Sequence, residues 1–261
     1  MAKIFTLIQG PATHLDQVID HYKGVDNVIW VTQTSESESA LSAIEKSNIT
    51  LLTYEGECFP GYGNINLQLK STQLGVKYCE QENASHILKI RSDSIFKDPK
   101  SFTDIMRVND RIQCYFYVKH NPPESHFQMS AQYREQIDKW IKWGKLDNKI
   151  EDLGDYDYTC DYLNFGPLEE MKRFWNTPLE TQFIPVPAEI KLMHRYLNEK
   201  CDKPYRVSYE FLSENIFDFF LSKAAKDNPV CSLKNAYSSV ELFNTPDTIK
   251  EGERVIQGYA G

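Results

Sequence analysis

The amino-acid sequence predicts an α/β fold in which helices flank a mostly parallel sheet. Over the first 120 residues, short runs of β-branched and aromatic residues alternate with amphipathic stretches, a pattern typical of βαβ units. The chain has 261 residues, a length that suits one large core. Its composition is 41% hydrophobic and 13% aromatic, which excludes a disordered chain and a fibrous one.

The individual elements follow from the periodicity of apolar residues. Runs rich in Ile, Val, Leu, Phe or Tyr predict strands at residues 3–9, 27–33, 49–54, 86–91 and 112–118. Apolar side chains at helical spacing predict helices between them, at residues 15–22, 37–46 and 66–81. Strands separated by helices build a mostly parallel sheet, and such sheets bind ligands beyond the carboxyl ends of their strands.

From Met129 onward the sequence predicts a helical, aromatic lobe that shares one core with the first half. Predicted helices cover residues 132–143, 168–175, 189–198 and 210–223. Residues 244–261 are polar and contain four glycine or proline residues, which predicts a tail. We therefore expect a single domain over residues 1–261, with halves at 1–125 and 126–243.

Charge and cysteine content exclude several classes of partner. The chain carries 29 Lys and Arg against 37 Asp and Glu, a net charge of −8, so it lacks the positive field that binds nucleic acid. Its six cysteines are scattered without a CxxC pair, which predicts reduced thiols in a cytoplasmic protein. No run approaches the roughly 20 apolar residues of a membrane helix. We therefore expect at most peripheral contact with the inner face of a membrane.

The first candidate site follows the first predicted strand, at Gln9-Gly10-Pro11. Glycine lets the backbone approach a ligand closely, although a plain turn between strand and helix explains the same residues. A second candidate lies where a long predicted helix begins, at Asn64, Asn66 and Gln68. Free N–H groups at a helix start favour phosphate, and an ordinary asparagine cap is the alternative. The preceding Gly61-Tyr62-Gly63 lacks the third glycine of a dinucleotide-binding fingerprint.

The fourth predicted strand ends in charged residues, Lys89-Ile90-Arg91-Ser92-Asp93. Lys89 and Arg91 are suited to hold phosphate oxygens, and the Asp93 carboxylate is suited to bind Mn²⁺ or Mg²⁺ that bridges them. An Arg–Asp ion pair without a ligand is the alternative interpretation.

Two further carboxylates are candidates for a general base, Asp161 and Glu189. Asp161 precedes an apolar segment, interpreted here as a turn that fixes it in a cleft. Glu189 lies where a predicted helix starts, and a favourable charge in the first helical turn explains it equally well. A literal D-x-D, Asp155-Tyr156-Asp157, lies in an acidic stretch that we interpret as a solvated loop.

Taken in order, these segments resemble the WavE-type lipopolysaccharide synthesis family of glycosyltransferases. The matching segments are Ile8-Gln9-Gly10-Pro11, Asn64-Ile65-Asn66-Leu67-Gln68 with Ser71, Thr72 and Gly75, and Lys89-Ile90-Arg91-Ser92-Asp93, with a fainter match at Asp161-Tyr162, Gly166 and Pro187-Ala188-Glu189. The match is good over residues 1–97 and thin beyond them.

The resemblance implies a GT-A-like fold, a nucleotide-sugar donor and a glycan or glycolipid acceptor in cell-surface polysaccharide synthesis. It makes residues 1–125 the donor half and 126–243 the acceptor half. The residues expected to bind the nucleotide sugar are Gln9, Gly10, Pro11, Asn64, Asn66, Gln68, Lys89, Arg91, Ser92 and Asp93. Asp161 or Glu189 would be the catalytic base. Arg91 stands where a full D-x-D motif has its first acid, so a cationic side chain there can neutralise the diphosphate without metal.

Two other functions remain open from the sequence. A sugar nucleotidyltransferase uses a related sheet, but it needs a glycine-rich, basic loop after the first strand, and residues 10–14 carry no Lys or Arg. A P-loop kinase is excluded because GxxxxGK[ST] does not occur. A carbohydrate-binding protein without catalysis is the third possibility, with aromatic side chains such as Trp140, Trp143 and Phe165 stacking on sugars.

Overall fold

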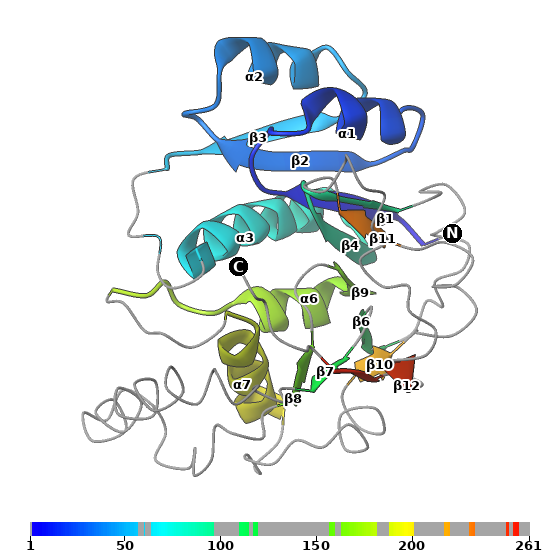
Figure 1. Ribbon diagram of the computed structural model, residues 1–261, viewed down its shortest axis with the longest axis vertical. Coiled ribbons are helices and arrows are strands. Elements are labelled where there is room, and N and C mark those ends of the chain that lie inside the picture. Colours follow the sequence, from blue (N-terminus) through cyan, green and yellow to red (C-terminus); the bar gives the residue numbers. More distant parts are fainter. Residues whose placement is uncertain are drawn as a thin grey trace.

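The computed structural model describes residues 2–56, 60, 64–96, 110–114, 117–119, 157–159, 163–181, 188–200, 217–219, 230–232, 249–250 and 253–255. Its main feature is a seven-stranded sheet of order β10-β6-β9-β4-β1-β2-β3 (Figure 1). The strands are β1 (Ile4–Gln9), β2 (Val28–Gln33), β3 (Thr50–Tyr54), β4 (His86–Arg91), β6 (Ile112–Cys114), β9 (Leu163–Pro167) and β10 (Phe217–Phe219). All neighbouring pairs except the two that involve β9 are parallel.

Helices cover both faces of this sheet, which confirms the predicted fold class. One face carries α1 (Leu15–His21) and α2 (Glu38–Glu45), and the other carries α3 (Ile65–Gln81) and α6 (Leu168–Trp175) (Figure 1). The helix α7 (Ala188–Lys200) packs next to α6. Alternate residues of each strand point to opposite faces, so Leu7 and Ile87 face α3 while Ile8 and Leu88 face α1.

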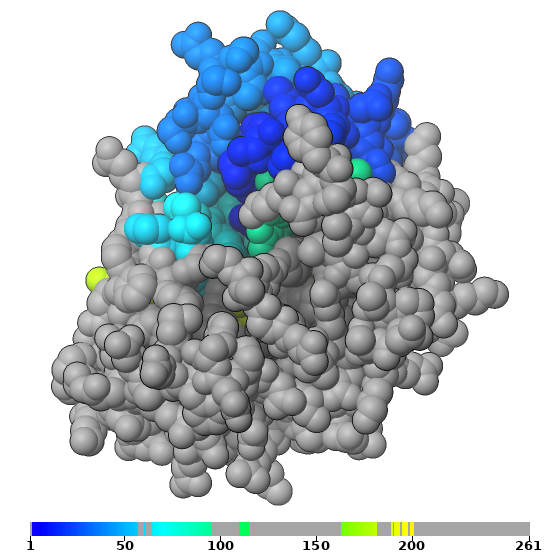
Figure 2. All heavy atoms as spheres, viewed as in Figure 1, coloured from blue at the N-terminus to red at the C-terminus, as the bar shows by residue number. Residues whose placement is uncertain are grey.

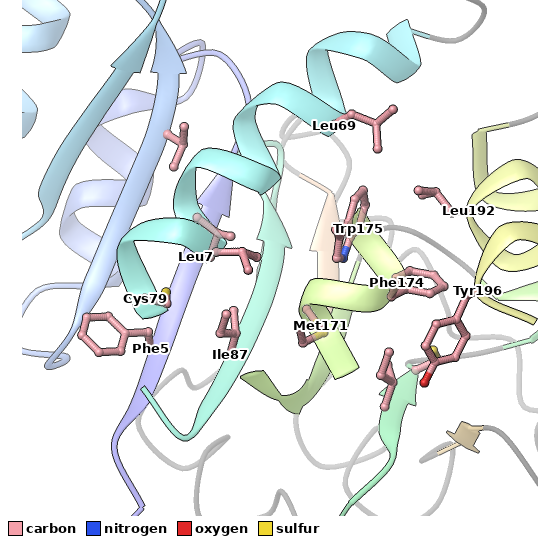
Figure 3. Packing of buried hydrophobic residues seen from close by; sticks show 14 of the residues in the cluster. Phe5, Leu7, Leu69, Cys79, Ile87, Met171, Phe174, Trp175, Leu192 and Tyr196 are labelled. Atoms are coloured by element: carbon pink, nitrogen blue, oxygen red, sulfur yellow. The ribbon is translucent and has the colours of Figure 1, made fainter. Parts of the chain in front are cut away.

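The core on the α3 face is the larger one. Aromatic side chains of α6 and α7 interlock there, with the rings of Phe174 and Tyr196 edge to face at 5.4 Å (Figure 3). Gly75 lets α3 lie directly on β1, because a Cβ atom at this position would be 2.2 Å from Leu7 Cδ1. The buried face of α3 carries Ile65, Leu69, Val76 and Cys79 beside Gly75.

Four sequence-based predictions are corrected by the structure. Residues 163–167, interpreted as an apolar turn, form β9, which lies between β4 and β6 with Leu163 to Gly166 buried. Residues 217–219, placed in a predicted helix, form β10 because pairing with β6 overrides the helical pattern. The predicted strand 112–118 is divided between β6 and β7 (Tyr117–Lys119), which belong to different sheets. The fourth concerns Phe165, a candidate for sugar stacking, which is fully buried in β9 and stacks on His86 instead.

The remaining strands form two small sheets. Strand β7 pairs with β8 (Asp157–Thr159) and with β13 (Glu253–Val255), which pairs with β12 (Ile249–Lys250). Asp157 of the D-x-D thus begins a strand, and part of the predicted tail is paired in a sheet. The other small sheet joins β5 (Ser94–Phe96) to β11 (Val230–Ser232).

Glu170 joins α6 to α7 and should matter for stability. Its carboxylate accepts a hydrogen bond from the Tyr196 hydroxyl and ion pairs from Lys200 at 2.5 Å and Arg173 at 3.0 Å. Burial and this carboxylate both raise the pKa of Tyr196. We expect Glu170→Ala to lower the free energy of unfolding by about 2 kcal/mol in chemical denaturation, because it leaves a buried hydroxyl and a cation without their partner. Glu169→Ala is the control, since Glu169 is exposed and forms an ion pair with Lys172 on the same helix; a loss as large as that of Glu170→Ala would contradict the prediction.

The two cysteines whose side chains are described should be unreactive because they are buried. Cys79 and Cys114 are free thiols with no exposed surface, and burial raises the pKa of Cys79 to about 12. Since the thiolate is the reactive form, alkylation of the native protein at pH 8 should spare both residues. Peptide mapping by mass spectrometry checks this, with urea-unfolded protein as the control in which both become modified. Modification of either residue in the native protein at the unfolded rate would contradict the prediction.

Candidate functional site

The carboxyl ends of β1 and β4 form the centre of the candidate site. From β1 the chain proceeds to β2 and β3 on one side of the sheet, whereas β4 lies on the other side of β1. The strand order therefore reverses between β1 and β4, and open α/β sheets bind ligands at such a point, outside the carboxyl ends of the strands. In Figure 2, green atoms from the region of β4 and β5 lie next to blue atoms of the N-terminal residues on the face in view.

The structure brings two of the predicted segments together at this point. Gln9 is paired with Arg91 across the two strands, and the Ser92 N–H donates to the Gln9 carbonyl at 2.8 Å. Gly10 has φ +130°, and a Cβ atom there would be 2.5 Å from Ser92 Oγ. The positive φ disfavours any other residue at this position, so glycine suits the point where the two loops approach each other.

Arg91 and Asp93 form a two-pronged ion pair at the end of β4. Arg91 Nε lies 2.9 Å from Asp93 Oδ1, and Arg91 Nη2 lies 2.6 Å from Oδ2. The Arg91 side chain is 23% exposed and that of Asp93 10%, so the pair is at the border of the solvent. Ser94 Oγ also donates to Asp93 Oδ1 at 3.3 Å. The Arg–Asp ion pair, considered above as an alternative, is therefore present, and it is located where the strand order reverses.

Asp93 in this arrangement does not fit a divalent cation. Both of its carboxylate oxygens bind the Arg91 guanidinium, whose positive charge opposes a metal ion at the same oxygens. Within the described part of the chain, no group of three or more His, Cys, Asp or Glu residues is placed to hold a metal.

Lys89 lies deeper in the sheet than predicted for a phosphate contact. It has no exposed surface, and its Nζ is 4.7 Å from the centre of the Trp175 ring, a cation–π contact. Lys89 is paired with Leu7 on one side and Asn164 on the other, two residues before the strand ends. Lys89 is therefore buried within the sheet rather than placed at the strand end.

The predicted residues at the start of α3 belong to a second group at the same edge of the sheet. Asn64 is exposed with φ 60° and forms no side-chain cap, so the ordinary cap considered above is absent. Asn66 is fully buried, and its amide exchanges two hydrogen bonds with the backbone of Glu180, at 2.8 and 2.7 Å. Gln68 is half-buried one turn later. Asn66 thus fastens the segment after α6 to the start of α3.

This second group extends to α7 through an ion pair. The Glu180 carboxylate binds Lys191, whose pKa is lowered by burial, while the ion pair favours its charged form. Glu189 lies two residues before Lys191 in the first turn of α7 and is half-buried. The structure therefore links Asn66 to Lys191 through Glu180, and the candidate base Glu189 lies on the same helix as Lys191. Asp161, the other candidate base, lies outside the described residues.

Sequence reasoning missed the residues that hold the β1 loop, Trp30 and Glu36. Trp30 Nε1 donates to the Gly10 carbonyl at 3.0 Å, and Glu36 Oε1 accepts from the Ala12 N–H at 3.1 Å. Both come from β2 or the segment after it. Because β2 lies next to β1, polar residues near its carboxyl end were a signal available in the sequence.

Comparisons with known proteins add little to this geometry. No family model and no curated protein sequence matches the chain. Among solved structures, the chain is similar to a cytidylyltransferase from Leptospira borgpetersenii serovar Hardjo-bovis, with 13% identity and a TM-score of 0.40 over 94% of this chain and 99% of the other. A likeness of this degree carries no argument about function. None of the described helices is long and apolar enough to cross a lipid bilayer.

Proposed function

We propose that the protein is a glycosyltransferase that moves a sugar from a nucleotide-sugar donor to a glycan or glycolipid acceptor. One observation carries the proposal. Gly10, at the end of β1, contacts Ser92 between the paired Arg91 and Asp93, at the point where the strand order reverses. Because Gly10 has no Cβ atom, a ligand can approach its backbone closely, and the neighbouring Arg91 guanidinium can bind phosphate oxygens. The resemblance of these segments to WavE-type proteins supports lipopolysaccharide or another surface polysaccharide as the product.

In this proposal Arg91 stabilises the departing nucleoside diphosphate. The guanidinium already forms a bidentate contact with a carboxylate, and a diphosphate offers the same paired oxygens with more negative charge. A diphosphate bound at the Arg91 guanidinium beside Asp93 would place the cation where charge develops as the bond between the anomeric carbon and the diphosphate breaks. Gln9, Gly10 and Pro11 would line the nucleotide pocket, while Asn64 and Gln68 would lie on its α3 side.

The acceptor side of the proposal depends on fewer described residues. A carboxylate must take the proton from the acceptor hydroxyl as that oxygen attacks the sugar. Glu189, half-buried in the first turn of α7, is the described candidate, and Asp161 is the other. Mn²⁺ or Mg²⁺ could bind Asp93, as the sequence suggested, only after Arg91 had released both carboxylate oxygens.

The proposed function is tested by a donor screen that reads release of nucleoside diphosphate. UDP-, GDP-, CDP- and ADP-sugars are incubated with purified protein and a mixture of bacterial glycolipid acceptors, with EDTA, Mn²⁺ or Mg²⁺. Release of a diphosphate from one donor class supports glycosyl transfer, and its persistence in EDTA supports neutralisation by Arg91 alone. Thermal shift with the same donors gives an independent readout, because a ligand of the native state raises the melting temperature.

The other two functions give different results in the same experiment. A sugar nucleotidyltransferase releases pyrophosphate from a nucleoside triphosphate and a sugar phosphate, which a parallel pyrophosphate assay detects. A carbohydrate-binding protein is stabilised by free glycans and by no nucleotide. Either of these results, together with no diphosphate release from any donor, would overturn the proposal.

A further inference from the structure

The loop between β1 and α1 has little structure of its own. It covers residues 11–14, in which Pro11 and Thr13 are exposed, and α1 begins at Leu15 without a side-chain cap from His14. Gly10 precedes the loop and adopts φ +130°. Glycine loses more conformational entropy on folding than any other residue, so fixing this conformation is costly. Something outside the loop must therefore hold it in place.

Two side chains from the β2 region supply that support from the α1 face. Trp30 is fully buried in β2, and its indole N–H donates to the Gly10 carbonyl at 3.0 Å. Glu36 follows β2, and its Oε1 accepts the Ala12 N–H at 3.1 Å, a charge-assisted hydrogen bond. Thr32, 1% exposed, donates its hydroxyl to the same oxygen at 3.0 Å and so orients the carboxylate.

We infer that Trp30 and Glu36 act as a clamp that positions the β1 loop for nucleotide binding. They are positioning residues, since they act through the Gly10 carbonyl and the Ala12 N–H. That the loop binds a nucleotide rests on the proposed function. Without the clamp the loop samples other conformations, and the apparent dissociation constant rises by the inverse of the fraction that stays competent. Steps after binding are unaffected, so the rate at saturating donor is kept.

The chain offers matched variants that separate positioning from direct contact. Glu36→Ala removes the acceptor and the charge, whereas Glu36→Gln keeps a side-chain oxygen for the Ala12 N–H and loses only the charge. Thr32→Val keeps the shape of Thr32 and removes the hydroxyl that orients Glu36. Glu38→Ala is the control, because Glu38 is exposed in the first turn of α2.

Two measurements on the full chain test the inference. The first is amide hydrogen exchange at Ala12 by NMR, which reports the clamp whether or not a nucleotide binds. The second is the dissociation constant for UDP, GDP and CDP by calorimetry, with the rate of diphosphate release at saturating donor. We expect Glu36→Ala to accelerate exchange at Ala12 and to weaken binding about 10-fold with an unchanged saturated rate. The dissociation constants of Glu36→Gln and Glu38→Ala should stay within about twofold of the wild-type value, and that of Thr32→Val should lie between the wild-type and Glu36→Ala values.

Three results would overturn the inference. Unchanged exchange at Ala12 in Glu36→Ala would show that the loop is held by other contacts. Faster exchange with unchanged nucleotide binding would show that the loop conformation does not matter to the ligand. Weak binding in Glu36→Gln with a protected Ala12 amide would show that the charge contacts the ligand directly. If the wild type binds no nucleotide at all, the proposed function fails, and exchange at Ala12 still decides whether Glu36 holds the loop.

Discussion

Replacing Arg91 with alanine is expected to lower the rate of nucleoside diphosphate release at least about 100-fold. Removal of one preorganised group that stabilises charge in the transition state costs roughly 10²- to 10³-fold in rate. Arg91 donates two hydrogen bonds to Asp93, at 2.9 and 2.6 Å, so its orientation is fixed before a ligand arrives. Steady-state kinetics with the donor found in the screen measures the effect, and a melting temperature near that of the wild type confirms that the variant is folded.

Variants of the partner residue show what Asp93 does. Asp93→Asn keeps an oxygen that accepts a hydrogen bond from Arg91, whereas Asp93→Ala leaves the guanidinium unfixed. If Asp93 acts by orienting Arg91, Asp93→Ala should lose most of the activity and Asp93→Asn should retain much of it. If Asp93 binds a divalent cation, both variants should lose activity equally and the remainder should no longer respond to Mn²⁺. Arg91→Ala with wild-type turnover would contradict the role proposed for the pair.

Gly75→Ala is expected to lower the free energy of unfolding by about 2 kcal/mol. The new Cβ would be 2.2 Å from Leu7 Cδ1 and 2.8 Å from Cδ2, and Leu7 is fully buried beneath α3. Overpacking of this kind costs roughly 1–3 kcal/mol or more, against about 1 kcal/mol gained because alanine favours a helix over glycine. Urea denaturation monitored by circular dichroism measures the difference.

The contact with Leu7 is tested by a double-mutant cycle. Leu7→Ala alone should cost about 3 kcal/mol through the cavity it leaves. In that background Gly75→Ala should become stabilising, because its methyl group then fills space and favours the helix. A destabilising effect of the same size in both backgrounds would place the strain of Gly75→Ala elsewhere than at Leu7.

The first half of the fold could be predicted because its signals are local. The strands β1 to β4 and the helices α1 to α3 begin and end within one or two residues of the predicted limits. In each of these elements, the spacing of the apolar residues reflects which of its faces are buried, so the sequence alone reveals the element. The helix α6 was predicted at its observed bounds for the same reason.

The second half depends on partners that are distant in sequence. Leu163-Asn164-Phe165-Gly166-Pro167 has the composition of a turn, yet it forms β9 because β4 and β6 pair with both of its edges. Gly166 also lets β9 lie close to β6, since a Cβ there would be 3.2 Å from Ile112 Cα. Pairing partners more than 50 residues away leave no periodic signal in so short a segment.

The candidate site divides in the same way. By itself the sequence determined which chemical groups end the strands, namely a glycine after β1 and two cations and an acid at β4, because side-chain identity and strand position are both local. Only the tertiary structure decided how they act together. It brought Gly10 against Ser92, paired Arg91 with Asp93, buried Lys89 against Trp175 and fastened the β1 loop to Glu36. These contacts arise from the order of parallel strands, which is fixed by packing across the whole sheet.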